Sequence, residues 1–243
     1  MAFGRKKRAE EAEEAVAAEE TPVVAERPVT TGPWDPADGP DDELSRVDLG
    51  GLRVLVPEGV EVRVEVSPEG QVVAATAVDR GSQLQLNAFA APKSDGIWSE
   101  VRTEIAEALR AQGGSAEEVD GPLGPELRAR IPAGNPGHTT PARFLGTDGP
   151  RWFLRGMITG PASTDVAQAS RLLETYRGTV VVRGSEAMAP RDALPLRLPR
   201  EAAAAAAELG HEDHEGHDHG DAAPGHIDDL NPFERGPEIT ETR

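Results

Sequence analysis

Residues 83–112 have the sequence QLQLNAFAAPKSDGIWSEVRTEIAEALRAQ, and the periodicity of this stretch changes halfway along. In the first part, Leu84 and Leu86 alternate with polar residues, which is the pattern of a half-buried strand. In the second part, apolar residues recur at every fourth position and predict a helix with one apolar stripe. The stripe consists of Ile97, Val101, Ile105 and Leu109, with Ala108 and Gln112 beside it.

The ends of this predicted helix carry suitable signals. Asp95 is placed to cap its N-terminus, and the pair Gly113-Gly114 is placed to end it. Because a striped helix next to alternating strands must bury its stripe, we expect a sheet with a helix packed on one face.

The same two patterns continue on both sides of this stretch. Alternating segments predict further strands at residues 47–49, 52–56, 60–66, 71–78, 116–119, 126–131, 143–145 and 151–158. Residues 165–177 predict a second helix, with Thr164 as its cap and with Val166, Ala169, Leu173 and Tyr176 on one face. The apolar run at residues 179–183 is typical of a central strand, and residues 188–199 predict an extended flap on the domain. The fold class is therefore α+β, with a mainly antiparallel sheet of seven to nine strands and two packed helices.

Charge divides the 243 residues into three parts. Residues 1–45 run from a basic start (+4 over residues 1–8) to a strongly acidic stretch (−11 over residues 9–45). Residues 46–199 are almost neutral (−2), and residues 200–243 are acidic again (−9). Highly charged segments with few aromatic residues cannot bury enough apolar surface to offset their ordering entropy. We therefore predict one folded domain at 46–199 between two disordered arms, 1–45 and 200–243.

Composition also narrows the function. The chain has no cysteine, which excludes disulfides and thiolate chemistry. Its longest apolar run, residues 202–207, is too short to span a membrane, so we expect a cytoplasmic protein. Acidic flanks on both sides disfavour nucleic acid as a partner. The sequence contains none of the common catalytic motifs, and this favours a protein that is not an enzyme.

Five arginines lie on successive predicted strands of the second half of the domain: Arg128, Arg130, Arg143, Arg151 and Arg155. If the strands bring them onto one face, they form a site for a phosphate or a carboxylate group. The alternative is that each arginine pairs with a glutamate across the sheet. Both alternatives remain open at this point.

The C-terminal arm is rich in histidine, with His211, His214, His217, His219 and His226 among acidic residues. Imidazole and carboxylate groups together suit a loosely bound divalent transition metal such as zinc, nickel or copper. The glycines at 210, 216 and 220 prevent a preorganised helix, so a purely solvating tail is the other interpretation. No other cofactor is indicated.

Isolated apolar residues in the arms suggest contacts with a protein partner. They are Trp34 in the N-terminal arm and Leu230, Phe233 and Ile239 at the C-terminal end. Such anchors are typical of short linear docking motifs. Each of them can equally pack on the domain of its own chain.

Several strings resemble a known family. They are Gly32-Pro33-Trp34-Asp35, then residues 88–94 and 97–102, then residues 149–156, 180–184 and 188–191. Together, over residues 32–199, they resemble an actinobacterial domain-of-unknown-function family of this length. The resemblance implies a cytoplasmic bacterial protein and assigns no catalytic residue. By analogy, the order of strands and helices also resembles the sandwich of the photosystem-P/Mog-type fold.

The sequence therefore favours a non-enzymatic binding or adaptor protein, whose folded domain presents flexible arms to a protein partner. One alternative is a domain or enzyme that binds a small molecule, with a phosphate or carboxylate group, through the strand arginines. Another alternative is metal handling by the histidine-rich tail.

Overall fold

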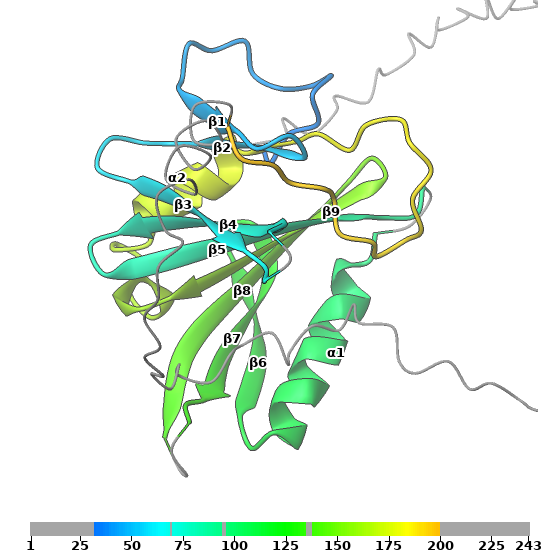
Figure 1. The fold of residues 1–243 in the computed structure, drawn as a ribbon. Coiled ribbons are helices and arrows are strands. Elements are labelled where there is room, and N and C mark those ends of the chain that lie inside the picture. Colours follow the sequence, from blue (N-terminus) through cyan, green and yellow to red (C-terminus); the bar gives the residue numbers. More distant parts are fainter. Residues whose placement is uncertain (1–31, 69, 94–95, 135–137, 200–243) are drawn as a thin grey trace, which may run out of the picture.

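The computed structural model describes residues 32–68, 70–93, 96–134 and 138–199. In this part of the chain, mainly antiparallel strands form two sheets, and two helices pack against them (Figure 1). This confirms the predicted α+β class. The large sheet has seven strands, within the predicted range of seven to nine, and three further strands form a separate small sheet that was not predicted.

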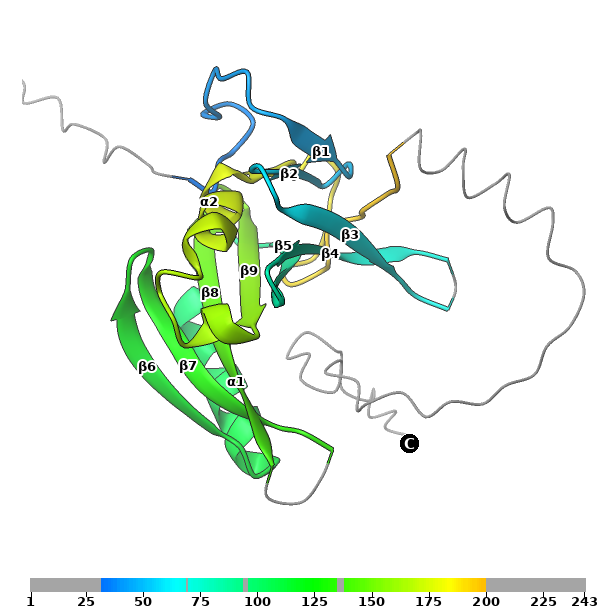
Figure 2. The same cartoon turned by 90° about the vertical axis from the view of Figure 1, so that its left-hand side faces the viewer.

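The large sheet has seven strands in the order β3-β4-β5-β9-β8-β7-β6, and every neighbouring pair is antiparallel. Its strands are β3 (Glu61–Val66), β4 (Val72–Asp79), β5 (Ser82–Ala90), β6 (Ser115–Gly121), β7 (Gly124–Pro132), β8 (Thr139–Gly149) and β9 (Trp152–Thr159). The two halves of the sheet meet where β5 pairs with β9, along eight residues of each strand. Figure 2 shows how strongly the sheet curves between its two edges.

The small sheet has the order β1-β2-β10, formed by β1 (Arg46–Asp48), β2 (Leu52–Leu55) and β10 (Val180–Val181). The β1–β2 hairpin confirms the predicted turn at Gly50-Gly51. The prediction of a central strand at residues 179–183 is wrong, because β10 is the last strand of this sheet. Its apolar residues are nevertheless buried, since Trp34 forms a bridge along the outer side of Val180.

The large sheet separates two hydrophobic cores. On one face, Leu84, Leu154 and Ile158 pack against helix α2 (Ser170–Gly178) and the small sheet, which together we call the cap layer. On the other face, Phe153 and Met157 pack with helix α1 (Trp98–Ala111), which lies mainly across β6 and β7. The alternation of side chains along β9 therefore supplies both cores at once.

Helix α1 confirms the predicted stripe, because Val101, Ile105 and Leu109 are buried. Trp98, Arg102 and Ala106 are buried as well, so the buried face is wider than the stripe. The cap differs from the prediction: Asp95 lies outside the described residues, and the carboxylate of Asp148 on β8 accepts hydrogen bonds from the backbone N–H groups of Ile97 (2.8 Å) and Trp98 (3.2 Å). A strand residue that lies 50 positions after Trp98 in the sequence therefore caps this helix.

Helix α2 begins at Ser170, five residues later than predicted. Residues before it form the short 3-10 helix η1 (Pro161–Ser163) and a turn, in which the Asp165 carboxylate accepts a hydrogen bond from the backbone of Ala167. Thr164 does not cap α2, because its hydroxyl donates back to Pro161. Val166 was wrongly assigned to the buried face and is 57% exposed.

The segment after β10 runs along the body in an extended form, as predicted for the flap. The backbone of Leu194 donates to Ala88 (2.9 Å), and that of Arg191 donates to Ala90 (2.7 Å). The pairing of β4 with β5 ends at Leu86. Beyond it, these bonds and the bridge between Phe89 and Ala193 place the flap beside β5 in the position that β4 occupies earlier along the strand. The side chain of Leu194 is buried in the core of the cap layer.

Tyr176 of α2, the single tyrosine of the chain, is fully buried against β9. Its hydroxyl donates to the carbonyl of Leu154 (3.0 Å) and lies 3.1 Å from the hydroxyl of Thr147. The ring fits because residue 156 is glycine: a Cβ there would lie 2.8 Å from a ring carbon. Burial raises the pKa of Tyr176 well above its ordinary value.

This raised pKa predicts how the protein responds to alkali. At about pH 11, a tyrosine with an ordinary pKa of about 10 is mostly ionised, whereas we expect Tyr176 to remain protonated in the folded protein. The stability that the protonated form contributes is complete below about pH 10 and is lost as the pH rises through the folded pKa. The near-ultraviolet phenolate band measures this, with Tyr176→Phe as the control. A phenolate band at about pH 11 in a still-folded protein would contradict the prediction.

Candidate functional site

The structure does not bring the five candidate arginines together. Arg128 and Arg143 are paired neighbours on β7 and β8, and Arg130 follows on the same face as Arg128. Arg155 lies on the opposite face of the sheet, and Arg151 lies exposed in the turn between β8 and β9 with a φ of 66°. Anion binding by these residues stays a prediction, now without a common site.

Arg143 is instead engaged by its own chain. Its Nη2 donates to the Glu126 carboxylate at 2.7 Å, and both side chains are almost completely buried (2% and 1% exposed). Arg128 approaches the other oxygen of Glu126 at 3.7 Å. A buried carboxylate thus holds one arginine tightly and a second loosely, which is the cross-strand pairing that the sequence left as the alternative.

Arg155 has a similar environment on the other face. Its Nη2 donates to the side-chain oxygen of Asn87 (3.1 Å), and its guanidinium lies 5.6 Å from the centroid of the Phe89 ring. Nearby on this face, the Glu65 carboxylate accepts hydrogen bonds from Thr76 and from Gln85 (2.8 Å). The polar side chains on this face thus form hydrogen bonds with other residues of the same chain.

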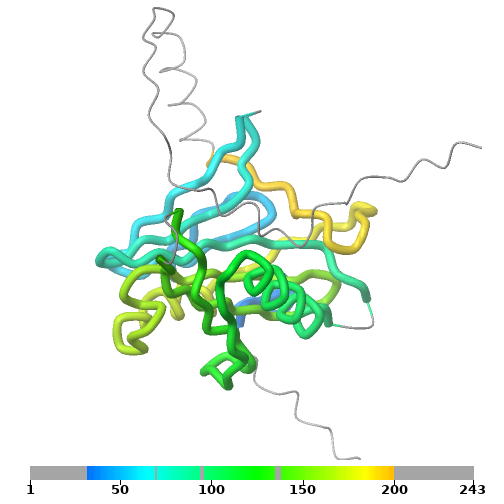
Figure 3. The backbone as a smooth tube through the Cα atoms, turned by 90° about the horizontal axis from the view of Figure 1, so that it is seen from below, coloured from blue at the N-terminus to red at the C-terminus, as the bar shows by residue number. Residues whose placement is uncertain are grey.

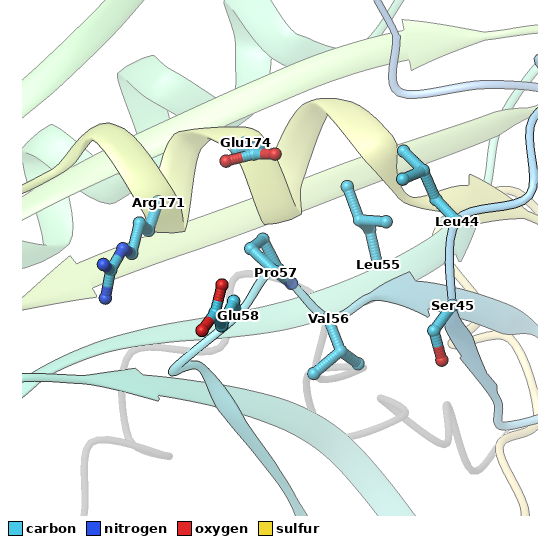
Figure 4. A pocket seen from close by; sticks show the side chains of 8 residues that line it. All are labelled: Leu44, Ser45, Leu55, Val56, Pro57, Glu58, Arg171 and Glu174. Carbon is cyan, nitrogen blue, oxygen red and sulfur yellow. The ribbon is translucent and has the colours of Figure 1, made fainter.

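A hollow of about 400 Å³ lies in the cap layer, where α2 faces the segments that enter β1 and leave β2 (Figure 4). Its lining combines apolar side chains with charged ones: Leu44, Ser45, Leu55, Val56, Pro57, Glu58, Arg171 and Glu174. Leu44 is 55% exposed, so the hollow presents an apolar side chain to solvent. Figure 4 shows Arg171 and Glu58 at one end of the hollow and Leu44 at the other. A hollow that combines apolar and charged side chains suits the docking of side chains from a partner.

Ion pairs stabilise the segments that line the hollow. The Arg46 guanidinium binds the Asp42 carboxylate at 2.6 Å and donates from Nε to the carbonyl of Gly178 (2.9 Å), which anchors the loop that carries Leu44. The hydrogen bond from Arg46 holds the pKa of Asp42 below its ordinary value. On the opposite wall, Arg171 lies 3.4 Å from the buried carboxylate of Asp79.

Both ends of the described body attach to the cap layer. At the N-terminal end, the backbone of Trp34 accepts a hydrogen bond from Val181 (2.8 Å) and donates one to Thr179 (2.9 Å). A contact between its side chain and a partner stays a prediction. At the C-terminal end, the backbone of Arg197 donates to Leu49 (2.9 Å). Residues 1–31 and 200–243 are therefore joined to the body at the layer that contains the hollow (Figure 1).

Other predicted site residues lie outside the described residues. They are the docking residues Leu230, Phe233 and Ile239 and the metal ligands His211, His214, His217, His219 and His226. Within the described ranges, no three potential metal-ligating side chains come together. No helix in those ranges is both long and apolar enough to cross a membrane. Metal binding by the tail stays a prediction.

Comparison with known proteins places the chain in a family. A family model described as "Protein of unknown function (DUF3710)" matches residues 32–205. The chain belongs to this family. The match starts at the Gly32-Pro33-Trp34-Asp35 string, and this segment of the DUF3710 protein bonds to the body: the Asp35 carboxylate accepts a hydrogen bond from the Trp152 indole (3.1 Å). No curated protein matches the chain.

Among solved structures, the DUF3710 chain is similar to the solution structure of cyanobacterial PsbP (CyanoP) from Synechocystis sp. PCC 6803. The identity is 18%, the match covers 57% of this chain and 92% of that chain, and the TM-score is 0.32. This similarity is too distant to assign a fold family or a function, so the photosystem-P/Mog-type resemblance stays a prediction.

Sequence reasoning missed the hollow in this DUF3710 protein. Its lining comes from residues 44–58 and from α2, which are separated by more than a hundred positions in the chain. Each residue has an ordinary local role as a loop, strand or helix residue. In the sequence, the only hint is Leu44 itself, a leucine that directly follows three acidic residues in the predicted N-terminal arm.

Proposed function

We propose that this DUF3710 protein is a non-enzymatic adaptor of the cytoplasm, in which the cap layer is the side that binds a protein partner. The observation that carries the proposal is the shared location of the hollow and of the starting points of both arms. A partner seated at the hollow is within reach of the terminal apolar residues Leu230, Phe233 and Ile239. Two weak contacts on one partner strengthen each other through effective concentration.

The reach of the C-terminal arm fits this arrangement. About 30 residues separate Pro199 from Leu230, and a flexible chain of that length spans on the order of 30 Å on average. Its acidic composition is the basis for the prediction that this arm is solvated. The apolar residues at its end are then available for docking.

The alternative of a small-molecule site built from the strand arginines has less support. Of the five candidates, Arg143 binds the Glu126 carboxylate and Arg155 binds the side-chain oxygen of Asn87. Arg128 lies 3.7 Å from the same Glu126 carboxylate. A phosphate would have to displace these partners on two different faces of the sheet.

The adaptor proposal is tested by capturing partners from the native host with variants of the full-length chain. We expect one partner to be lost both when Leu230, Phe233 and Ile239 are changed together to alanine and when Leu44 is changed to aspartate. Melting temperatures should stay nearly unchanged in both variants, because Leu44 belongs to neither described core and the C-terminal arm is predicted not to pack on the domain.

Two matched controls accompany these variants. Changing Asn231, Glu234 and Glu238 to alanine alters the same segment but keeps its apolar residues. Val166→Asp introduces the same charge as Leu44→Asp at a residue of similar exposure, 57% against 55%, outside the hollow. Equal capture by all variants would refute the adaptor proposal. A fall of many degrees in the melting temperature of the triple variant would show that the tail packs on its own body.

A further inference from the structure

Strand β3 forms one edge of the large sheet. It pairs with β4 on one side, and among the described residues no strand pairs with its other side. Figure 3 shows the β3–β4 hairpin extending away from the rest of the body, and Figure 2 shows the same from another side. An edge strand presents unpaired backbone N–H and C=O groups, which are able to bind another strand.

The side chains of β3 alternate strictly. Glu61, Arg63 and Glu65 lie on the face of the sheet that carries α1, whereas Val62 and Val64 pack partly against the core of the cap layer. Val66, the next on the valine side, is 50% exposed. The strand therefore has a charge row of alternating sign on one face and a valine row on the other.

The irregularity in this hairpin lies on β4. Glu65 pairs with Ala74 and Val66 pairs with Val72, so Val73 is the extra, bulged residue. A bulge on β4 explains why Val73 is exposed and leaves β3 itself regular. A regular, unbulged edge is the kind that continues a sheet most readily.

We infer that two copies of this chain pair antiparallel through the outer edges of β3, with the twofold axis at Val64, so that their large sheets become continuous. In this register, Arg63 lies opposite Glu65 of the second copy, and Glu65 lies opposite Arg63 of the second copy. On the other face, Val62 lies opposite Val66 of the second copy. The dimer thus forms two pairs of opposite charge and covers the exposed valine.

Charge complementarity identifies the second copy as the occupant of this edge. A twofold axis at Arg63 would place arginine opposite arginine and glutamate opposite glutamate, which is destabilising in cross-strand pairs. An axis at Val62 pairs Glu61 with Arg63 but places Val66 opposite Glu58, which lies outside β3. Of these three registers, only the axis at Val64 satisfies both the charged and the apolar row.

The absence of cysteine makes this register directly measurable. Directly opposite residues of an antiparallel pair have Cβ atoms about 4.5–5.5 Å apart, so Val64→Cys in the full chain should form a disulfide-linked dimer under mild oxidation. Val62→Cys alone should not, whereas a mixture of Val62→Cys and Val66→Cys chains should. Glu117→Cys on β6, the opposite edge of the sheet, is the control and should stay unlinked.

A second measurement does not depend on cross-linking. Arg63→Glu places glutamate opposite glutamate twice, and we expect the dissociation constant from analytical ultracentrifugation to rise about tenfold or more. Arg80→Glu, the same charge change in the exposed β4–β5 turn, should leave it unchanged. A chain that stays monomeric at the highest concentration, or a dimer in which Val64→Cys fails to cross-link, would overturn the inference.

Discussion

Replacing Arg143 with methionine is expected to reduce the free energy of unfolding by about 3–5 kcal/mol. The change leaves the carboxylate of Glu126 buried between β7 and β8 without the hydrogen bond that it receives at 2.7 Å. The remaining arginine near it, Arg128, lies at 3.7 Å and is half exposed, so it compensates little. Urea unfolding followed by tryptophan fluorescence measures the loss.

The double variant Arg143→Met/Glu126→Leu separates the cost of a broken pair from the net contribution of the intact pair. We expect it to regain most of the lost stability, because an apolar pair of similar volume removes both buried charges. Among the described residues, Nε of Arg143 and Oε1 of Glu126 are buried without a hydrogen bond, so the native pair is not fully satisfied. Arg128→Met is the matched single control, with an expected effect within about 0.5 kcal/mol. A loss of that size for Arg143→Met itself would contradict the prediction.

Truncating Ile105 to alanine is the other large expected effect, with a loss of about 2–5 kcal/mol. Ile105 lies in the middle of the buried face of α1 and belongs to the core that this helix shares with Leu127, Phe144 and Phe153. The truncation removes a side chain that is almost fully buried and leaves a cavity between the helix and the sheet. The same urea unfolding experiment measures it.

Glu107→Ala provides the control on the exposed face of the same helix. It changes no buried contact and should alter stability by no more than about 0.5 kcal/mol. An effect of Ile105→Ala below half a kcal/mol would show that the stripe of α1 does not face a core.

Most secondary structure was predictable because it depends on local periodicity. The alternation at residues 60–66 appears in the structure as a strand whose Val62 and Val64 are half-buried. The fourfold repeat from Ile97 to Leu109 appears as a helix with the expected buried residues. Errors arose where local pattern and tertiary contacts disagree. Val166 continues the apolar pattern of α2, but it lies in the turn that precedes the helix and is exposed there.

The candidate site was less predictable than the fold. The five arginines follow each other along the sequence. In the sheet, Arg128, Arg130 and Arg143 lie on one face and Arg155 lies on the other, because side chains alternate between faces along each strand. The hollow depends on the meeting of residues 44–58 with α2. Neither arrangement has a local signature, since both follow from contacts between distant segments.

The sequence by itself determined the period of each element, and with it the α+β class, the two helices and the apolar faces that they bury. These properties depend on side-chain spacing over a few residues, which the backbone geometry of strands and helices converts directly into faces. The tertiary structure alone decided that Asp148 caps α1, that Glu126 binds Arg143, that Trp34 covers β10 and that β3 is an edge. Each of these depends on which distant strands become neighbours, because burial and pairing are satisfied across the whole fold at once.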